Sequence, residues 1–309
     1  MTTKTNDTIT IATRNSPLAL WQAEYAAKLI EETFPNIKTE LLPMTTKGDQ
    51  ILDVTLNKIG GKGLFLKELE QAMLAGKADI AVHSMKDVPA DLPEDFTICS
   101  IFKRHDASDA FVSNKYDSFN DLPQNATVGT SSLRRQSQLL AIRPDLNIVP
   151  LRGNVQTRLK KLDDGEYDAI ILATAGLERM EYDDRIKQKL DNSLCLSAVG
   201  QGAVGVECLS NREDLIDLFS QLNHQETLKC VTAERAMNRI LNGSCSVAIG
   251  ALAESTDKGI SLQAVVCAPD GSKVLHQKVQ DEDPEEAGLK AAYALLAAGA
   301  QELLDMANP

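Results

Sequence analysis

The stretch "GKADIAVHS", residues 76–84, decides the fold, because "GEYDAIILATAG", residues 165–176, repeats its pattern later in the chain. Each passes from a helix-closing glycine through an aspartate into a buried apolar strand and then a polar turn. Strands alternate with helices around both stretches, which is typical of βαβ units and a mostly parallel sheet. We therefore predict an α/β protein with two similar domains related by an internal duplication.

The first of these domains is predicted to start with a strand at residues 8–14 and a helix after it. Ser16 is the expected N-cap of that helix and Pro17 its first residue. The apolar residues expected to face the core from this helix are Leu18, Trp21, Tyr25 and Leu29. "LSAVGQGAVGVECL", residues 196–209, is predicted to return to this domain as a strand.

From residue 224 onward the pattern changes. One long amphipathic helix, three strands joined by short polar turns and one final Ala/Leu-rich helix predict a small α+β domain with a three-stranded antiparallel sheet. The predicted domains are therefore residues 1–104 with 200–222, residues 105–199, and residues 223–309.

Composition limits the class of protein. The formal net charge of -12 disfavours nucleic-acid binding, which needs a basic face. No run approaches the roughly 18 consecutive apolar residues of a membrane span, and no signal-peptide pattern opens the chain. The 6 cysteines lack the spacing of a zinc site, and all except Cys245 are expected to be buried thiols. We expect a soluble cytoplasmic protein without a structural metal.

Arginines follow the predicted strands of the second domain. In "VGTSSLRRQ", residues 128–136, Thr130 and Ser132 precede a helix whose first turn holds Arg134 and Arg135. Cations at a helix N-terminus interact unfavourably with the helix dipole. This placement therefore favours the interpretation that the arginines bind an anion over the alternative that they are ordinary surface residues. The chain lacks phosphate-loop glycine motifs, and planar guanidinium groups suit carboxylates as well as phosphates. Similarly placed arginines are Arg14, Arg152, Arg158 and Arg179.

Two further motifs carry reactive groups. "AVHSMKDVP", residues 81–89, presents Ser84, Lys86 and Asp87 at the carboxyl end of a buried strand, where open α/β sheets bind ligands. Asp87 there is suited to stabilise a developing cation, or else to pair with Lys86 in a structural turn. In "NGSCSVAIG", residues 242–250, Cys245 lies in a turn, and cationic surroundings would favour its thiolate without a histidine partner.

Taken in order, these motifs resemble those of the porphobilinogen deaminase family along essentially the whole chain. The resemblance implies three domains, the first two doubly wound and like periplasmic binding proteins, and the third the small α+β domain. It implies a transferase that deaminates four porphobilinogen molecules and joins them head to tail into hydroxymethylbilane, in haem biosynthesis. The family works on a dipyrromethane cofactor held by a thioether, here to Cys245. Six arginines then suit a chain of pyrroles that bears two carboxylates per ring.

The same match implies residue roles. Asp87 is the catalytic carboxylate, which binds pyrrole N–H groups and stabilises the azafulvene cation formed when ammonia leaves, and Lys86 is catalytic beside it. The implied cofactor-binding residues are Cys245, Lys86, Asp87, Ser84, Thr130, Ser132, Arg134, Arg135, Arg152 and Gly153. The implied substrate-binding residues are Arg14, Ser16, Arg152, Arg158, Arg179, Gln201, Lys58 and Lys62.

Three expectations complete this interpretation. Lys58 and Lys62 lie in a polar stretch, residues 47–63, that is predicted to be a mobile lid. Ser244 stands where the family often has a second glycine. Porphobilinogen is the expected partner of a monomer that binds no nucleic acid, membrane or metal. The alternative is a non-enzymatic, two-lobed anion-binding protein, which would use the same arginines but gives Cys245 no role.

Overall fold

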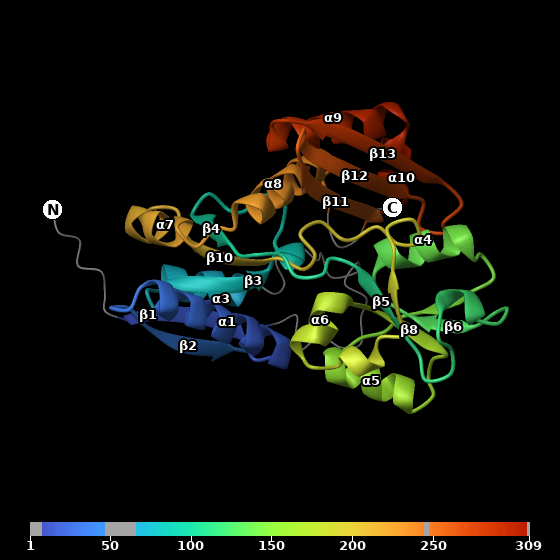
Figure 1. Cartoon of the computed structure of the whole chain (residues 1–309), viewed down its shortest axis with the longest axis horizontal. Helices are drawn as coiled ribbons and strands as arrows, with labels where there is room; N and C mark the ends of the chain where they lie inside the picture. Colours follow the sequence, from blue (N-terminus) through green and yellow to red (C-terminus); the bar gives the residue numbers. More distant parts are fainter. Residues whose placement is uncertain (1–7, 47–65, 244–246, 308–309) are drawn as a thin grey trace. The chain divides into compact units, whose positions relative to one another are not determined.

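The computed structural model describes residues 8–46, 66–243 and 247–307, whose helices and strands are drawn in Figure 1. Among these residues the chain forms two compact units. The first comprises residues 8–46, 66–104 and 203–228, and the second comprises residues 105–202, 229–243 and 247–307.

The first unit contains a five-stranded sheet in the order β2-β1-β3-β10-β4. β1 runs parallel to β2 and β3, whereas β10 runs antiparallel to β3 and β4. The predicted return strand is therefore confirmed as β10. The strands are β1 (Thr8–Arg14), β2 (Lys38–Met44), β3 (Ile80–Ser84), β4 (Phe96–Ile101) and β10 (Val204–Leu209), and the helices are α1 (Pro17–Thr33), α3 (Lys67–Leu74) and α7 (Glu213–Ser220).

The second unit contains a sheet with the same plan, in the order β7-β6-β8-β5-β9. β6 runs parallel to β7 and β8, and β5 is the antiparallel strand beside β8 and β9. This repeated strand order confirms the prediction of two similar α/β domains. The strands are β5 (Asp109–Val112), β6 (Thr127–Gly129), β7 (Asn147–Val149), β8 (Ala169–Ala173) and β9 (Gln188–Leu190), and the helices are α4 (Leu133–Ile142), α5 (Val155–Asp163) and α6 (Thr174–Arg179).

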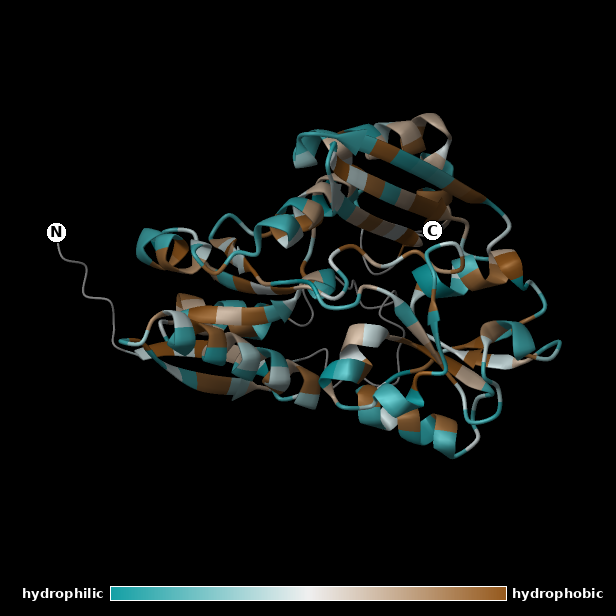
Figure 2. Cartoon of the chain, viewed as in Figure 1, coloured by the Kyte–Doolittle hydropathy of each residue, from teal (hydrophilic) through white to brown (hydrophobic). Residues whose placement is uncertain are grey.

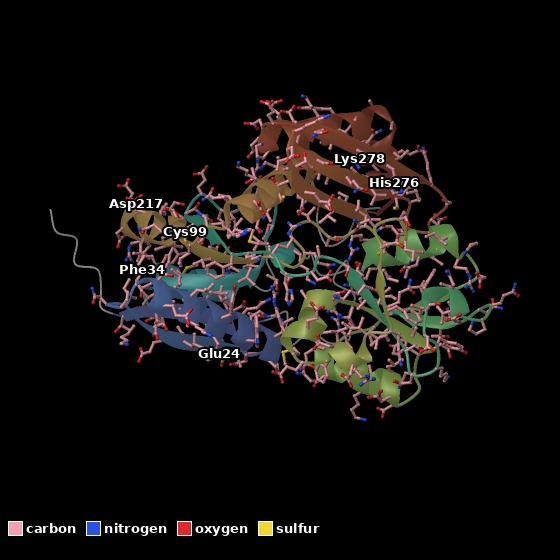
Figure 3. The ribbon with its side chains drawn as sticks, viewed as in Figure 1. Glu24, Phe34, Cys99, Asp217, His276 and Lys278 are labelled. Carbon is pink, nitrogen blue, oxygen red and sulfur yellow. The ribbon has the colours of Figure 1, made fainter. Side chains whose placement is uncertain are left out.

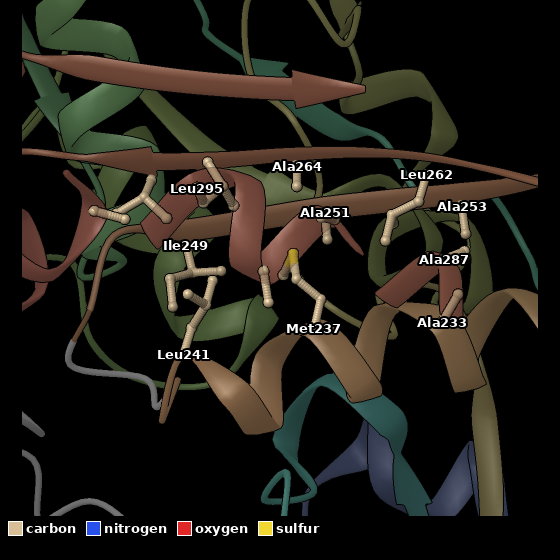
Figure 4. Close-up of a cluster of buried hydrophobic side chains, with 14 of the residues drawn as sticks. Ala233, Met237, Leu241, Ile249, Ala251, Ala253, Leu262, Ala264, Ala287 and Leu295 are labelled. Carbon is tan, nitrogen blue, oxygen red and sulfur yellow. The ribbon is translucent and has the colours of Figure 1, made fainter. Parts of the chain in front are cut away.

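A three-stranded antiparallel sheet, β11-β12-β13, follows in the same unit, as predicted. In its core, alanine and leucine side chains of the sheet pack against helices. Figure 4 shows the side chains of Met237 and Leu295, from two of these helices, in this core. Gly288 lets two of these helices approach closely, because a Cβ there would lie 2.4 Å from the carbonyl oxygen of Ala233. The elements are α8 (Gln225–Ile240), β11 (Ile249–Thr256), β12 (Gly259–Cys267), β13 (Val274–Asp281), α9 (Pro284–Ala297) and α10 (Ala300–Ala307).

One sequence prediction was wrong in detail and a second was incomplete. The single final helix is divided into α9 and α10 at Gly299, whose φ of 97° ends the first helix. The stripe predicted on α1 is confirmed in part, because all four predicted residues are half-buried and Tyr25 and Leu29 pack against the core. The buried side chains of α1 are Gln22, Ala23, Ala26 and Ile30.

The surface follows the expected pattern of polar and apolar residues. Figure 2 shows hydrophilic and hydrophobic residues side by side along the helices, as expected of helices with one buried face. His276 and Lys278 are both exposed on β13 (Figure 3). No helix in the described part of the chain is long and apolar enough to cross a membrane.

Candidate functional site

The first candidate edge is the carboxyl end of β1 and β3. Ile11 lies opposite Ile80 in the parallel pair, so both strands end on the same side of the sheet. Ligands of open α/β sheets bind at this edge. Five predicted site residues lie at this edge: Arg14 at the end of β1, Ser16 at the start of α1, Ser84 at the end of β3, and Lys86 and Asp87 in the 3-10 turn Met85–Asp87.

Gln22 connects the helix to this edge. The Ser16 hydroxyl caps α1 by accepting a hydrogen bond from the backbone N–H of Ala19 at 3.4 Å, and Pro17 follows it. The helix then buries Gln22, whose Nε2 donates to the Ser84 hydroxyl at 2.8 Å. Sequence reasoning missed Gln22, and the available signal was a glutamine between apolar residues on the buried face.

Asp87 keeps its carboxylate available. Met85 anchors the turn, because its side chain is buried and its backbone N–H donates to the carbonyl oxygen of Ala203 at 3.0 Å. Gly205 makes room for it, since a Cβ there would lie 2.2 Å from the Met85 sulfur. Asp87 is half-buried, and its carboxylate makes no hydrogen bond or ion pair with the residues that the structure describes. The alternative ion pair with Lys86 is therefore not formed within those residues.

The second candidate edge is the carboxyl end of β6, β7 and β8. Ser131 ties two of its loops together, because its hydroxyl donates to the carbonyl oxygen of Leu151 at 2.9 Å and accepts from the N–H of the same residue at 3.0 Å. The predicted residues gathered here are Thr130, Ser132, Arg134 and Arg135 after β6, Arg152, Gly153 and Arg158 after β7, and Arg179 after β8.

Caps and one glycine shape the loops of this edge. Ser132 caps α4, accepting a hydrogen bond from the N–H of Arg135 at 3.4 Å. Gly153 has a φ of 110°, and a Cβ there would lie 2.7 Å from Cγ2 of Thr157, so other residues would be strained. The Nε of Arg158 donates to the carbonyl oxygen of Gly153 at 2.8 Å, which fixes that arginine against its own loop.

The arginines after β6 converge on a carboxylate that sequence reasoning missed. Asp109, the first residue of β5, is 0% exposed. Its Oδ2 accepts from Nη1 of Arg134 at 2.7 Å, and its Oδ1 accepts from Nε of Arg135 at 3.0 Å and from Nη2 at 2.7 Å. Oδ1 also accepts from Nε2 of Gln201 at 2.9 Å, and Oδ2 from the Cys195 thiol at 3.3 Å. The only sequence signal was an acidic residue at the start of the apolar strand "DAFV".

Charge pairing explains why this buried carboxylate is stable. Burial alone raises the pKa of Asp109, but the guanidinium groups of Arg134 and Arg135 outweigh it and hold the pKa well below its usual range. Burial, followed by the charge of Asp109, raises the pKa of the Cys195 thiol to about 12. Asp109 is thus an anion and Cys195 a neutral donor at neutral pH. The sequence predicted that the arginines at the start of α4 bind an anion. The carboxylate of Asp109 is one such anion, and it comes from the protein itself.

A glycine turn completes the second edge. Gln201 is buried and its Nε2 also donates to the carbonyl oxygen of Ala107 at 2.7 Å, while Nη2 of Arg179 donates to the carbonyl oxygen of Gly202 at 2.8 Å. Gly202 has a φ of 84° and lies against the backbone of His105, whose oxygen would be 2.6 Å from a Cβ. The turn is therefore fixed in position.

Glu234 holds the same turn from α8. Its Oε2 accepts from the N–H of Gly200 at 2.7 Å and its Oε1 from the N–H of Ala253 at 2.8 Å. A single buried carboxylate thus bonds both the turn and the antiparallel sheet. It is a second acidic residue that the sequence reasoning did not select.

Several predicted residues lie outside the described residues. These are Cys245, Lys58, Lys62 and the rest of the predicted lid, together with Ser244. The remaining cysteines, Cys99, Cys195, Cys208, Cys230 and Cys267, are buried free thiols, as predicted. Within the described ranges no group of three or more His, Cys, Asp or Glu side chains is arranged to hold a metal ion.

The histidines have separate structural contacts. His83 is buried against Glu207, with 2.8 Å between Nε2 and Oε2, and Nε2 of His105 lies 3.4 Å from Glu178. His224 contacts the Thr227 hydroxyl through Nδ1 at 2.9 Å. The fourth, His276, is on the exposed face of β13. These contacts give His83, His105 and His224 a local explanation that does not involve nucleophilic catalysis.

The fold and the two edges define the class of protein. It is an α/β protein with two related sheets, which gathers arginines, hydroxyl groups and one accessible carboxylate at the carboxyl ends of parallel strands. Such strand ends and helix N-termini bind anionic ligands.

Comparison with known proteins identifies the family. Residues 9–217 match the model "Porphobilinogen deaminase, dipyromethane cofactor binding domain", and residues 228–297 match "Porphobilinogen deaminase, C-terminal domain". A porphobilinogen deaminase of Nitrosomonas europaea is 53% identical over 298 residues, which cover 96% of this chain and 97% of that protein. One of Laribacter hongkongensis is 50% identical over 299 residues, with 96% and 97% covered. The chain belongs to the porphobilinogen deaminase family.

The similarity to solved structures is much weaker. The VFT2 domain of BvgS from Bordetella pertussis is 13% identical, with a TM-score of 0.46 over 70% of this chain and 87% of that domain. This likeness is too distant to carry an argument. The family membership rests on the matches over nearly the whole chain.

Proposed function

We propose specific residue roles for the family reaction in this chain. The family enzyme is a transferase that deaminates porphobilinogen and joins four molecules into a linear tetrapyrrole on a dipyrromethane cofactor. In the proposal Cys245 holds the cofactor by a thioether, Asp87 is the catalytic carboxylate with Lys86 beside it, and the arginines of both edges bind carboxylate side chains. The single observation that carries the catalytic assignment is the half-buried Asp87 carboxylate without a bond to the described residues.

The residues of the second edge fit the cofactor. Arg134 is 5% exposed, and only its Nη1 donates within the described part of the chain, so its Nε and Nη2 are oriented donors for another acceptor. A carboxylate is the natural partner of such a guanidinium edge. When bound, the dipyrromethane supplies the pyrrole carbon to which the first substrate ring is joined. Thr130, Ser132, Arg134, Arg135, Arg152 and Gly153 would hold its acetate and propionate groups, together with Ser84, Lys86 and Asp87.

Asp87 performs an electrostatic task in this proposal. The porphobilinogen side chain becomes cationic as ammonia leaves, and a fixed carboxylate next to the ring stabilises that charge and accepts a hydrogen bond from the pyrrole N–H. The turn anchored by Met85 holds Asp87 without engaging its oxygens. Arg14, Ser16, Arg152, Arg158, Arg179 and Gln201, with Lys58 and Lys62 in the lid, would bind the substrate carboxylates.

The remaining parts of the proposal concern organisation. The domains are residues 1–104 with 200–222, residues 105–199, and residues 223–309. We propose that the enzyme acts as a monomer in the cytoplasm, on porphobilinogen and without nucleic acid, membrane or metal. The five buried free thiols support a reducing compartment, because thiols of cytosolic proteins are normally kept reduced. Sedimentation at several protein concentrations tests the monomer.

The experiment that tests the proposed function is intact-mass measurement of the parent protein and Cys245→Ala. The parent should carry the mass of a dipyrromethane, whereas Cys245→Ala should be folded, without the added mass and inactive. The matched control, Cys230→Ala, removes a buried thiol of α8 and should keep the added mass. An added dipyrromethane mass on Cys245→Ala would overturn the assignment.

A further inference from the structure

We propose that Asp109 is a positioning residue that orients Arg134 toward a carboxylate of the bound dipyrromethane. The inference rests on the proposed function of the second edge and adds a residue to it. Asp109 itself is 0% exposed, so it does not touch the ligand. Asp109 acts through the guanidinium group of Arg134, whose Nε and Nη2 remain available to the ligand.

The two arginines bonded to Asp109 are held differently. Arg135 uses all three of its nitrogens, because Nε and Nη2 donate to Asp109 and Nη1 donates to the carbonyl oxygen of Ile171 at 2.9 Å. Arg134 uses Nη1 alone, which donates to Asp109 and to the carbonyl oxygen of Leu196 at 2.7 Å. Arg135 is therefore held mainly by the protein and keeps one N–H on each Nη for the cofactor-binding role proposed above, whereas Arg134 presents its whole Nε–Nη2 edge to a ligand.

Geometry explains why Asp109 sets the direction of Arg134. A guanidinium group is planar, so fixing Nη1 against Asp109 and the Leu196 carbonyl fixes the directions of Nε and Nη2 as well. Asp109 is itself oriented by Gln201, whose Nε2 also bonds the carbonyl oxygen of Ala107. The result is a rigid chain of contacts from the glycine turn to the donors of Arg134.

Charge gives the same assignment. Two adjacent guanidinium groups carry a charge of two, and the Asp109 anion leaves a net charge of one on the three side chains. Without Asp109 the arginines would repel one another and turn outward, and a ligand carboxylate would have to reorganise them. With it, the site presents one cation with preset donors, which is the preorganised form that favours binding.

The test is the rate at which apoprotein acquires the dipyrromethane mass when incubated with porphobilinogen, followed by intact-mass spectrometry and expressed per folded molecule. Asp109→Asn keeps the size of the side chain and removes its charge. We expect the rate to fall about 10²-fold, since misplacing a binding group by about 1 Å has an effect of this size. A merely structural residue would lower the folded fraction without changing the rate per folded molecule.

The matched control is Asp79→Asn. Asp79 also accepts from an arginine and from a backbone N–H, at 3.3 Å from Nη1 of Arg212 and 2.9 Å from the N–H of Thr10, but it lies outside both edges. Its uptake rate should equal that of the parent. Parental uptake by folded Asp109→Asn would overturn the proposal alone, whereas absence of the adduct from the parent would overturn the proposed function.

A second variant covers the case in which Asp109→Asn does not fold. Asp109→Asn combined with Arg135→Gln removes one charge of each sign, so the three side chains keep a net charge of one. Arg134 then lacks its orienting carboxylate without an added buried cation, and slow uptake is again expected. Parental uptake by this double variant would overturn the proposal. Failure of both variants to fold would also overturn it, because Asp109 would then be required for the fold rather than for the orientation of Arg134.

Discussion

The two five-stranded sheets share one strand order, yet their carboxyl edges use an aspartate in opposite ways. Asp87, after β3, is half-buried and makes no bond with the described residues. Asp109, in β5, is fully buried and accepts from two arginines, a glutamine and a thiol. The comparison teaches that the surroundings, and not the residue type, decide whether a carboxylate acts on a substrate or on its neighbours.

The physical reason is the cost of removing a charge from water. A buried anion is stable only when it is paired and hydrogen-bonded, and once satisfied it has no capacity left for a ligand. A partly exposed anion keeps its charge through solvent and remains available to a cation that develops beside it. The two similar sheets thus differ in their aspartates: one carries the carboxylate that we propose for the chemistry, and the other carries a carboxylate that pairs with two arginines.

The largest effect is expected for Asp87. Asp87→Asn removes the charge but keeps the size, and turnover should fall about 10²- to 10³-fold, the usual loss for such a group. Asp87→Glu keeps the charge but displaces it, and misplacement by about 1 Å also costs about 10²-fold, so Glu should retain more activity than Asn. Steady-state ammonia release from adduct-loaded protein measures both.

Asp217→Asn is the control for this prediction, because Asp217 is exposed on α7 (Figure 3). It should turn over at the parental rate. Parental turnover by adduct-loaded Asp87→Asn would instead leave Asp87 as a structural turn residue.

An intermediate effect is expected on stability in acid. The pKa of Asp109 is depressed in the folded state, so its contribution to stability is complete above the unfolded pKa of about 4. As the pH falls below about 4 the unfolded chain takes up this proton first, and the free energy of unfolding decreases. Denaturant unfolding between neutral pH and pH ~2 should show a steeper decrease for the parent than for Asp109→Asn. Equal slopes would show that Asp109 is not paired as described.

The smallest effect is expected at Gln22. Gln22→Leu removes the donor to the Ser84 hydroxyl, and a hydrogen bond of this kind contributes about 1 kcal/mol, or roughly fivefold in binding. Because Ser84 is proposed to bind the dipyrromethane, we expect the rate at which apoprotein acquires the dipyrromethane mass to fall by that factor, while turnover per loaded molecule changes little. Glu24→Gln, at an exposed position of the same helix (Figure 3), should change neither rate. Identical uptake rates for Gln22→Leu and the parent would remove Ser84 from the cofactor-binding residues.

Local patterns were enough to predict most of the fold. Alternating strands and helices, the caps at Ser16 and Ser132 and the polar turns between β11, β12 and β13 are properties of short segments. The break at Gly299 was missed because an Ala/Leu-rich segment continues on both sides of it. The core face of α1 was predicted in part, since Tyr25 and Leu29 pack on the core, but Gln22 was missed because it is buried by a hydrogen bond to another segment, which periodicity does not reveal.

The candidate site was predictable only where the residues stand next to one another in a motif. Arg134 and Arg135 were selected by their position at a helix start, but their common partner was not. The Asp109 carboxylate accepts hydrogen bonds from α4, from Cys195 and from Gln201, and these side chains reach it only after β5 has paired with β8 in the sheet. Such long-range pairing has no sequence pattern of its own.

The most direct test of the contrast between the two carboxylates is turnover divided by adduct occupancy, measured side by side for Asp87→Asn and Asp109→Asn. We predict that Asp87→Asn loses about 10²- to 10³-fold in turnover per loaded molecule. Asp109→Asn should lose mainly occupancy, with its few loaded molecules turning over within about tenfold of the parent, the range expected of an indirect effect of about 1.4 kcal/mol. An equal loss per loaded molecule in both variants, or a loss of occupancy confined to Asp87→Asn, would contradict the account.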